Sequence, residues 1–226
     1  MTPETLLSYQ LPLFDGLRPD DLAGIPLEVC EQNLSAWQTL FHQNDSCKDL
    51  YFLLSGSLMA VAWTAEGREI VFSQVEVGAY FGEITAIDGK ARSLAVVAKT
   101  DALVLAMQRH SFLALFDRIP VIRNRVTHSM AGRIRSLTER AIELAVLSVE
   151  QRVGAHLLRL AAGQGAMTQG TVIDPAPTHA EIGGHIGANR EMVSRSIGRL
   201  TRQGLIKTSR RRIEIVDPAA LADLLA

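Results

Sequence analysis

The sequence contains little cysteine and no long apolar run, and each shortage excludes a class of protein. Cys30 and Cys47 are the only cysteines among 226 residues. Two thiols cannot hold a four-thiolate iron–sulfur cluster or a zinc finger, and they are too few for a disulfide framework. No apolar stretch approaches the roughly 20 residues that span a bilayer, and the first residues lack the basic segment of a secretory signal. We therefore expect no membrane association and a cytoplasmic location.

Motifs of catalysis and metal binding are also missing. The histidines are scattered singly, without metal-ligand spacing, and the sequence has neither a Gly-rich triphosphate loop nor a nucleophile elbow. We expect no enzyme, with no catalytic residue, no metal and no cofactor. The composition, 47% apolar and 21% charged, is instead that of an ordinary globular chain. Its length suits two modest domains.

Opposite charges balance over the whole chain but not within each part of it. The net charge is −1, yet residues 151–226 carry ten Lys and Arg against six Asp and Glu. Eight of those ten basic residues lie between Arg190 and Arg212. A local basic cluster on a balanced protein suggests a polyanionic partner for that cluster. A solvated helix face is the alternative interpretation.

Glycines divide the N-terminal half into short apolar runs. Two short helical stretches, Glu4–Leu7 and Arg18–Gly24, come first, and β-type runs then follow from Gln38 to Met107. Short strands at regular spacing with glycine turns are typical of an antiparallel barrel or roll. Phe112–Phe116 predicts a short helix after the last strand. We therefore expect an α+β fold that begins with an antiparallel β-roll over residues 1–120.

A long helix is predicted over residues 121–148, which contain no proline and one glycine. Apolar residues recur in it at strict four–three spacing and are flanked by charges. A narrow apolar stripe of this kind usually forms a coiled-coil interface, so we expect a homodimer. The alternative is that the stripe packs on its own β-domain. The predicted interface residues are Met130, Ile134, Leu137, Ala141 and Leu144.

Residues 149–226 predict a winged helix-turn-helix. A helix over Val149–Ala162 precedes it, and the Thr178–Glu181 pair is a capping box that starts a helix at His179. Gly187 ends that helix, and Asn189 caps a second one that runs to about Gln203. Two short helices across a tight turn form a helix-turn-helix. The residues from 205 to 217 then predict a β-hairpin with a basic tip, which is the wing.

Residues 81–93 carry the sharpest chemistry. Gly82 leads a turn into a short helix, whose free backbone N–H groups favour an anion. Arg92 offers a planar fork and Ser93 a hydroxyl donor for a phosphate, and Glu83 can accept a hydrogen bond from a sugar hydroxyl. The set suits a ligand with one phosphate and one ribose. A Glu83–Arg92 salt bridge that closes a hairpin is the alternative.

These residues, after a glycine-punctuated roll, resemble the phosphate-binding cassette of cyclic-nucleotide-binding domains. From about Leu13 to Val216, the roll, long helix and winged helix-turn-helix together resemble the Crp–Fnr superfamily of bacterial transcription regulators, and within it the catabolite activator branch. The resemblance implies ligand contacts at Gly82, Glu83, Ile84, Arg92, Ser93, Leu137 and Thr138. Leu137 stands where the activator has a threonine that contacts adenine. Cyclic AMP and cyclic GMP therefore both remain open as the effector.

The segment from Asn189 to Arg195 resembles the activator's recognition helix, including its Arg-Glu-x-x-x-Arg triplet. Arginine binds guanine O6 and N7, and glutamate accepts from cytosine N4, so the triplet suits a G·C-containing major-groove site. An intrahelical Glu191–Arg195 pair is the alternative. The resemblance implies a palindrome of TGTGA-like half-sites. The predicted DNA contacts are Thr178, Asn189, Arg190, Glu191, Ser194, Arg195, Arg199 and Arg211.

These inferences combine into one expected organisation: residues 1–120 form the cyclic-nucleotide-binding roll, 121–148 the dimerisation helix and 149–226 the DNA-binding domain. Expected partners are double-stranded DNA, a second copy of the chain, a cyclic nucleotide and RNA polymerase. One alternative is a regulator of the same architecture that senses another effector or none. The other is an enzyme with the roll as a regulatory module, which needs a catalytic constellation within residues 149–226.

Overall fold

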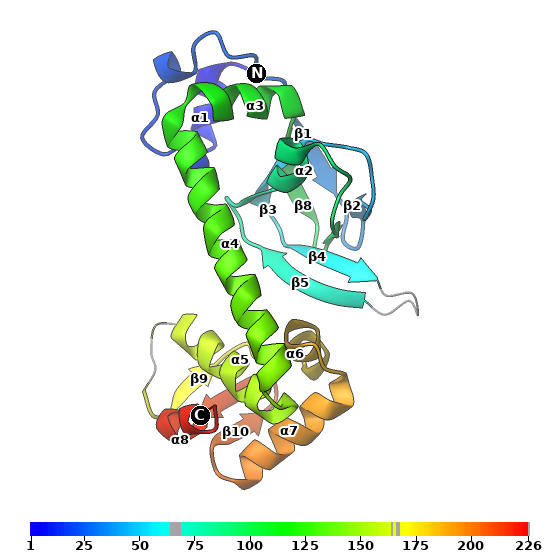
Figure 1. Cartoon of the computed structure of the whole chain (residues 1–226), viewed down its shortest axis with the longest axis vertical. Helices are drawn as coiled ribbons and strands as arrows, with labels where there is room; N and C mark the ends of the chain where they lie inside the picture. Colours follow the sequence, from blue (N-terminus) through cyan, green and yellow to red (C-terminus); the bar gives the residue numbers. More distant parts are fainter. Residues whose placement is uncertain (64–68, 164, 166–167, 226) are drawn as a thin grey trace. The chain divides into compact units, whose positions relative to one another are not determined.

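The computed structural model describes residues 1–63, 69–163, 165 and 168–225 (Figure 1). The chain divides into two compact units, Met1–Arg133 and Ile134–Ala226. The division falls inside α4 (Pro120–Val146), a single helix of 27 residues that contributes to both units. The domain boundaries predicted at residues 120 and 148 stay a prediction.

Two antiparallel four-stranded sheets form the core of the N-terminal unit (Figure 1). The first sheet has, in spatial order, β1 (Val29–Leu34), β8 (Ala102–Met107), β3 (Leu50–Ser55) and β6 (Tyr80–Phe81). The second has β2 (Thr39–Phe41), β7 (Ala95–Ala98), β4 (Leu58–Trp63) and β5 (Glu69–Val75). The α+β fold with an N-terminal antiparallel roll is confirmed.

Strand β3 shows why one run in this unit is apolar throughout. Successive side chains of a strand point to opposite faces of its sheet. Leu50 and Phe52 belong to the cluster formed with α1 (Pro3–Ser8) and α3 (Arg109–Arg118). Tyr51 and Leu53 belong to a second cluster shared by the two sheets. Both faces of β3 are therefore buried.

Strand β1 was not predicted. Three of its six residues are the polar run from Glu31 to Asn33, and only Leu34 is buried. It lies at the edge of its sheet, where one side of the strand has no neighbour, and it pairs with β8 alone. An edge strand that faces solvent lacks the apolar alternation by which strands are recognised. The predicted stretch Arg18–Gly24 forms a short 3-10 turn over Pro19–Leu22.

The helix α4 ends at Val146, and α5 (Val149–Gly163) begins after a break at Ser148. Ser148 causes the break because its side chain accepts from the backbone N–H of Gln151, while Gln151 Oε1 accepts from the Ser148 N–H at 2.8 Å. This reciprocal arrangement satisfies two free donors at a helix start. The ranges predicted for these two helices, 121–148 and 149–162, agree with the structure within two residues, whereas the helix predicted over Phe112–Phe116 begins earlier, at Arg109.

The C-terminal unit is a winged helix-turn-helix, as predicted. Helix α6 (His179–Ile186) carries the Thr178–Glu181 capping box and ends at Gly187, which has φ +65°. Helix α7 (Arg190–Arg202) is capped by Asn189. The wing is the antiparallel pair β10 (Ile206–Ser209) and β11 (Arg212–Ile215). An unpredicted strand, β9 (Thr171–Ile173), pairs with β11, and α8 (Pro218–Asp223) follows.

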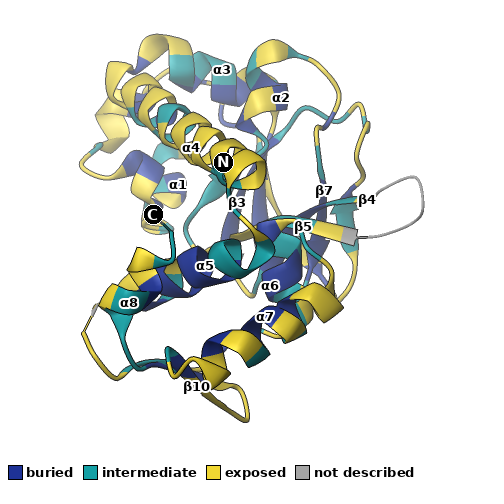
Figure 2. Cartoon of the chain, turned by 60° about the horizontal axis from the view of Figure 1, so that its bottom comes forward, coloured by how far each residue is buried: buried dark blue, intermediate teal, exposed yellow. Residues whose placement is uncertain are grey.

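One buried cluster unites the elements of this unit, because each helix turns its apolar side inward (Figure 2). Val193, Ile197 and Leu200 are the inward residues of α7, and its remaining length is largely exposed. The turn before α7 is tight at Gly183. A Cβ there would lie 2.4 Å from the carbonyl oxygen of Ala188, so only glycine fits.

Candidate functional site

The predicted cassette is built around Gly82 and Arg92. Gly82 has φ +88° and caps α2 (Glu83–Asp88), a left-handed conformation that favours glycine. A Cβ at Gly82 would lie 2.5 Å from Nη1 of Arg92. The same guanidinium donates to the carbonyl oxygens of Gly82 at 3.2 Å and Asp49 at 2.6 Å. The glycine therefore makes room for the arginine.

Among the residues that the structure describes, the guanidinium of Arg92 is a buried charge without a carboxylate partner. Arg92 is 2% exposed, and its guanidinium carbon lies 4.2 Å from the ring centroid of Phe41 and 5.5 Å from that of Tyr51. Within the described ranges, no Asp or Glu oxygen lies within 4.0 Å of its nitrogens, and Nε has no hydrogen-bond partner. Buried charges are normally paired, so this position favours an anionic ligand.

Glu83 is the second buried charge of the cassette, and an unpredicted residue neutralises it. Glu83 is 2% exposed, and its Oε1 accepts from Nη1 of Arg133 at 2.6 Å. Arg133, on α4, also donates to the carbonyl oxygen of Tyr80 at 3.3 Å. The alternative Glu83–Arg92 salt bridge is not formed, because each residue has other partners. No local sequence signal links Arg133 to Glu83, because the two residues are 50 positions apart.

The other predicted ligand contacts lie in different surroundings. Ser93 follows Arg92 and is exposed, and Ile84 on α2 is 45% exposed. Leu137 and Thr138 belong to the part of α4 in the C-terminal unit and are both exposed. The Thr138 hydroxyl donates to the carbonyl oxygen of Ile134 at 2.9 Å. The structure thus brings Gly82, Glu83 and Arg92 together in one unit.

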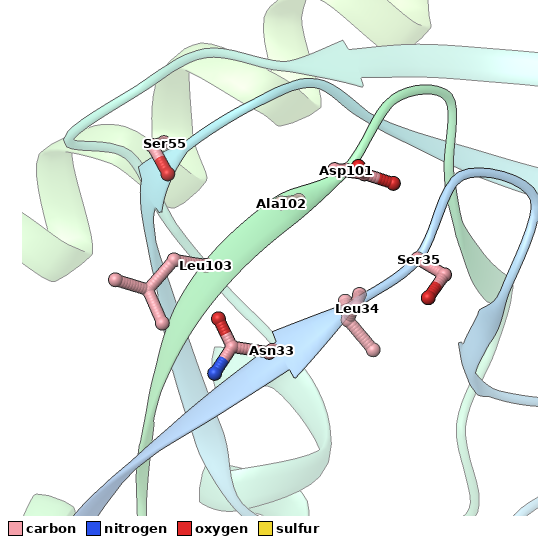
Figure 3. A pocket seen from close by; sticks show the side chains of 7 residues that line it. All are labelled: Asn33, Leu34, Ser35, Ser55, Asp101, Ala102 and Leu103. Atoms are coloured by element: carbon pink, nitrogen blue, oxygen red, sulfur yellow. The ribbon is translucent and has the colours of Figure 1, made fainter.

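A separate cavity of about 340 Å³ lies where β1 and β3 end and β8 begins (Figure 3). It is lined by Asn33, Leu34, Ser35, Ser55, Asp101, Ala102 and Leu103, none of which belongs to the cassette. Its one carboxylate, Asp101, already accepts from the backbone N–H of Ala36 at 2.8 Å. The cavity therefore offers no free charged group to a ligand.

The exposed face of α7 carries the predicted reading residues. Arg190, Glu191 and Arg195 are exposed, opposite the buried Val193 and Ile197. The alternative Glu191–Arg195 pair is absent from the ion pairs of the described residues. Three charged side chains on one open helix face can reach the edges of bases in a major groove.

The remaining predicted DNA contacts have partners within the unit. Thr178 and Asn189 are exposed N-caps of α6 and α7. Arg199 pairs with Glu150 of α5 at 3.0 Å. Ser194 is half-buried, and its Oγ is hydrogen-bonded to Nδ1 of His179 at 2.7 Å. Arg211 is exposed at the tip of the wing, where it adopts φ +55°.

The apolar stripe of α4 is mostly exposed. Ile134, Leu137 and Leu144 are exposed by 62%, 55% and 53%. Met130 differs from them, because it is half-buried and packs against the core of the N-terminal unit. In the C-terminal unit, a Cβ at Gly187 would lie 3.0 Å from Cδ2 of Leu144, so the end of α4 abuts the turn between α6 and α7.

A stacked histidine pair lies inside the C-terminal unit. The rings of His156 on α5 and His185 on α6 have centroids 5.2 Å apart. Burial lowers the pKa of His156 to about 4, and the positive charges of His185, Arg159 and Arg140 act in the same direction. Its Nε2 atom is buried without a hydrogen-bond partner among the described residues.

In the ranges that the structure describes, no helix is both long and apolar enough to cross a membrane. The same ranges hold no group of three or more His, Cys, Asp or Glu side chains placed to bind a metal ion.

The fold and its two sites define a class: a transcription regulator with a cyclic-nucleotide-binding fold and a winged helix-turn-helix. Family models support each part separately. The cyclic nucleotide-binding domain matches residues 31–119, and the Crp-like helix-turn-helix domain matches residues 151–224.

Individual relatives extend this likeness over nearly the whole chain. The cyclic AMP receptor protein of Thermus thermophilus is 30% identical over 218 residues, 94% of this chain and 96% of the relative. The cAMP-activated global transcriptional regulator CRP of Salmonella typhimurium is 33% identical over 178 residues, 78% of this chain and 85% of the relative. This chain belongs to the Crp–Fnr family of transcription regulators.

Solved structures agree on the fold. A CRP-family transcriptional regulator from Thermus thermophilus superposes with a TM-score of 0.65 at 27% identity, covering 86% of this chain and 98% of the other. The c-di-GMP responsive regulator CLP of Xanthomonas campestris has a TM-score of 0.71 at 23% identity, covering 84% and 94%. Because CLP is described as responsive to c-di-GMP, the shared fold does not fix the effector.

Proposed function

We propose that this protein is a cytoplasmic, homodimeric transcription regulator that binds a 3′,5′-cyclic nucleotide, cyclic AMP or cyclic GMP, in its N-terminal unit. One observation carries the proposal: among the described residues the buried Arg92 guanidinium has no carboxylate partner, and it donates to the carbonyl oxygen of Gly82, the residue that precedes the buried Glu83. A cyclic phosphate supplies the missing anion. A ribose hydroxyl supplies a donor for the carboxylate.

The choice of base rests on Thr138, which the family resemblance places near the purine. Its hydroxyl proton is used in the bond to the Ile134 carbonyl, so its oxygen remains only as an acceptor. An acceptor suits the 6-amino group of adenine and not the 6-oxo group of guanine. This favours cyclic AMP, although Leu137 supplies no second polar contact.

The proposed DNA site is a palindrome of two inverted TGTGA-like half-sites. Arg190, Glu191 and Arg195 are exposed on one face of α7 and suit two guanines and a cytosine amine. The exposed stripe of Ile134, Leu137, Ala141 and Leu144 is the proposed dimer interface. A two-fold dimer requires the half-site to recur about one helical turn away, roughly 34 Å. RNA polymerase is the proposed further partner at a promoter.

Two measurements test this function. Calorimetric titration of the full chain with cyclic AMP, cyclic GMP, cyclic di-GMP and, as control, 5′-AMP should show tightest binding of cyclic AMP. Binding to the TGTGA palindrome should then strengthen in its presence by about 1–3 kcal/mol, the usual range of coupling between sites, and binding to a scrambled duplex should not. Tightest binding of cyclic di-GMP, or no binding of any nucleotide, would replace the proposed effector.

A further inference from the structure

The two helices of the helix-turn-helix are joined by a side-chain hydrogen bond between two half-buried residues, one on each helix. Nδ1 of His179 lies 2.7 Å from Oγ of Ser194. His179 is the first residue of α6, and Ser194 is the fifth residue of α7. Ser194 follows Arg190 by one turn and precedes Arg195, both of which are exposed. The bond therefore reaches the face of α7 to which we assign base reading.

This bond determines what Ser194 can offer to a base. A serine hydroxyl has one proton and two lone pairs, and Nδ1 of an imidazole either accepts or donates. When Nδ1 accepts the Ser194 proton, only lone pairs remain, which accept from cytosine N4 or adenine N6. When Nδ1 carries a proton, it donates to Oγ, and the hydroxyl is free to donate to guanine or to thymine O4. The role of Ser194 is thus set by His179.

The packing of α7 does not need this bond. Val193, Ile197 and Leu200 are each 4% exposed or less and anchor the helix in the core. The turn between the helices is fixed separately, by the bond from the N–H of Ala188 to the carbonyl of Gly183 at 2.9 Å. Because the core already holds α7 in place, the hydrogen bond between His179 and Ser194 is not needed to position the helix. Its effect is on the orientation of the Ser194 hydroxyl.

We propose that His179 is a positioning residue that fixes Ser194 Oγ and selects its hydrogen-bonding role, so that the two residues together read one base position of the DNA site. This inference rests on the proposed function, because it takes α7 to be the reading helix. It goes further by assigning specificity to a residue on α6 that is absent from the predicted contacts.

The test compares variants on a duplex library in which each position of the TGTGA half-site is substituted in turn, with cyclic AMP present. Ser194→Ala and His179→Leu should each flatten the preference at the same single position by about five-fold or more, as expected for the loss of one good base contact. The double variant should add little to either change, because the two residues act as one unit. Preferences at the other positions should persist.

Two further variants separate positioning from a structural role. Asparagine places an amide close to where Nδ1 lies, so His179→Asn should restore the preference that His179→Leu removes. His110→Leu, in the N-terminal unit, is the matched control and should behave as wild type. Thermal unfolding of each variant shows whether the unit remains folded.

The outcomes are distinct. Equal weakening at all positions by His179→Leu, or no rescue by His179→Asn, overturns the inference and leaves the proposed function intact. A change in Ser194→Ala alone also overturns it. Absence of any sequence preference in the wild-type chain contradicts the proposed DNA reading itself, and the inference falls with it.

Discussion

The two sites of this protein hold their charges in opposite ways. In the N-terminal unit, Arg92 and Glu83 are each 2% exposed and already bonded to groups of the chain. In the C-terminal unit, Arg190, Arg195 and Arg211 are exposed. A ligand that enters the first site must offer these two side chains better hydrogen bonds than they already make within the chain. Because the site is buried, little water competes for those bonds. At the second site, DNA binds to hydrated arginines. Each of them contributes little binding free energy alone, and salt weakens that contribution.

This contrast indicates what each site is built to distinguish. A buried, prearranged pair of charges rejects a ligand that lacks the matching groups, because the pair then loses partners and gains none. An open face tolerates any duplex through its phosphates and distinguishes sequences only where a side chain reaches a base edge.

The first prediction concerns His156, a buried histidine of the C-terminal unit. Burial lowers the pKa of His156 to about 4 in the folded chain, from its ordinary value of 6.5. Because the unfolded chain takes up the proton more readily, the stability of the C-terminal unit is complete above pH 6.5 and falls as pH drops toward 4. The loss at pH 4 is about 3 kcal/mol, at 1.36 kcal/mol per pH unit.

Chemical unfolding between pH 7 and 4 measures this loss. Both tryptophans, Trp37 and Trp63, lie in the N-terminal unit, so their fluorescence follows that unit, and circular dichroism follows both. His156→Leu should remove most of the pH dependence, and His110→Leu should keep it. An unchanged dependence in His156→Leu would assign the effect to other groups.

The second prediction removes the unpaired buried charge. Arg92→Ala should weaken binding of cyclic AMP by at least ten-fold, since a hydrogen bond to a charged group contributes about 1.5–3 kcal/mol. Lys90→Ala, an exposed cation of the same segment, is the control and should bind as wild type. Calorimetry measures both. Unchanged affinity in Arg92→Ala would place the ligand elsewhere.

The third prediction compares two exposed arginines of the C-terminal unit. Arg195→Ala should cost roughly 1–3 kcal/mol at the TGTGA palindrome and relax the preference for guanine at one position. Arg211→Ala should weaken binding to all duplexes and reduce the salt dependence, because phosphate contacts carry little sequence information. Titrations of both variants on cognate and scrambled duplexes at two salt concentrations decide this. Equal losses on both duplexes for Arg195→Ala would mean that α7 does not read bases.

The smallest expected effect is on the choice of base. Thr138→Ala should reduce affinity for cyclic AMP by about 0.5–1.5 kcal/mol, the usual contribution of one neutral hydrogen bond, and affinity for cyclic GMP by less. With Leu137 in place of a polar residue, discrimination between the two nucleotides should be weaker than in the catabolite activator. A strong preference for cyclic AMP that survives Thr138→Ala would contradict this reasoning.

Local signals predicted local structure well. The start of α6 follows from the Thr178–Glu181 box, because both partners of that cap lie within one turn. Residues 82, 83 and 92 could be assembled because one short segment carries them all. The Glu83–Arg133 pair could not, since its members are 50 residues apart and meet only through tertiary packing. Strand β1 was missed because pairing with β8, and not its own pattern, defines it.

The contact between Leu144 and Gly187 has a mechanical consequence. A Cβ at position 187 would lie 3.0 Å from Cδ2 of Leu144, so the side chain of Leu144 occupies the space that a larger residue would need. The lack of a side chain at position 187 therefore sets how closely the last turn of α4 approaches the turn between α6 and α7. The methyl group of an alanine at position 187 would crowd Leu144, so either the end of α4 or the turn between α6 and α7 would have to shift.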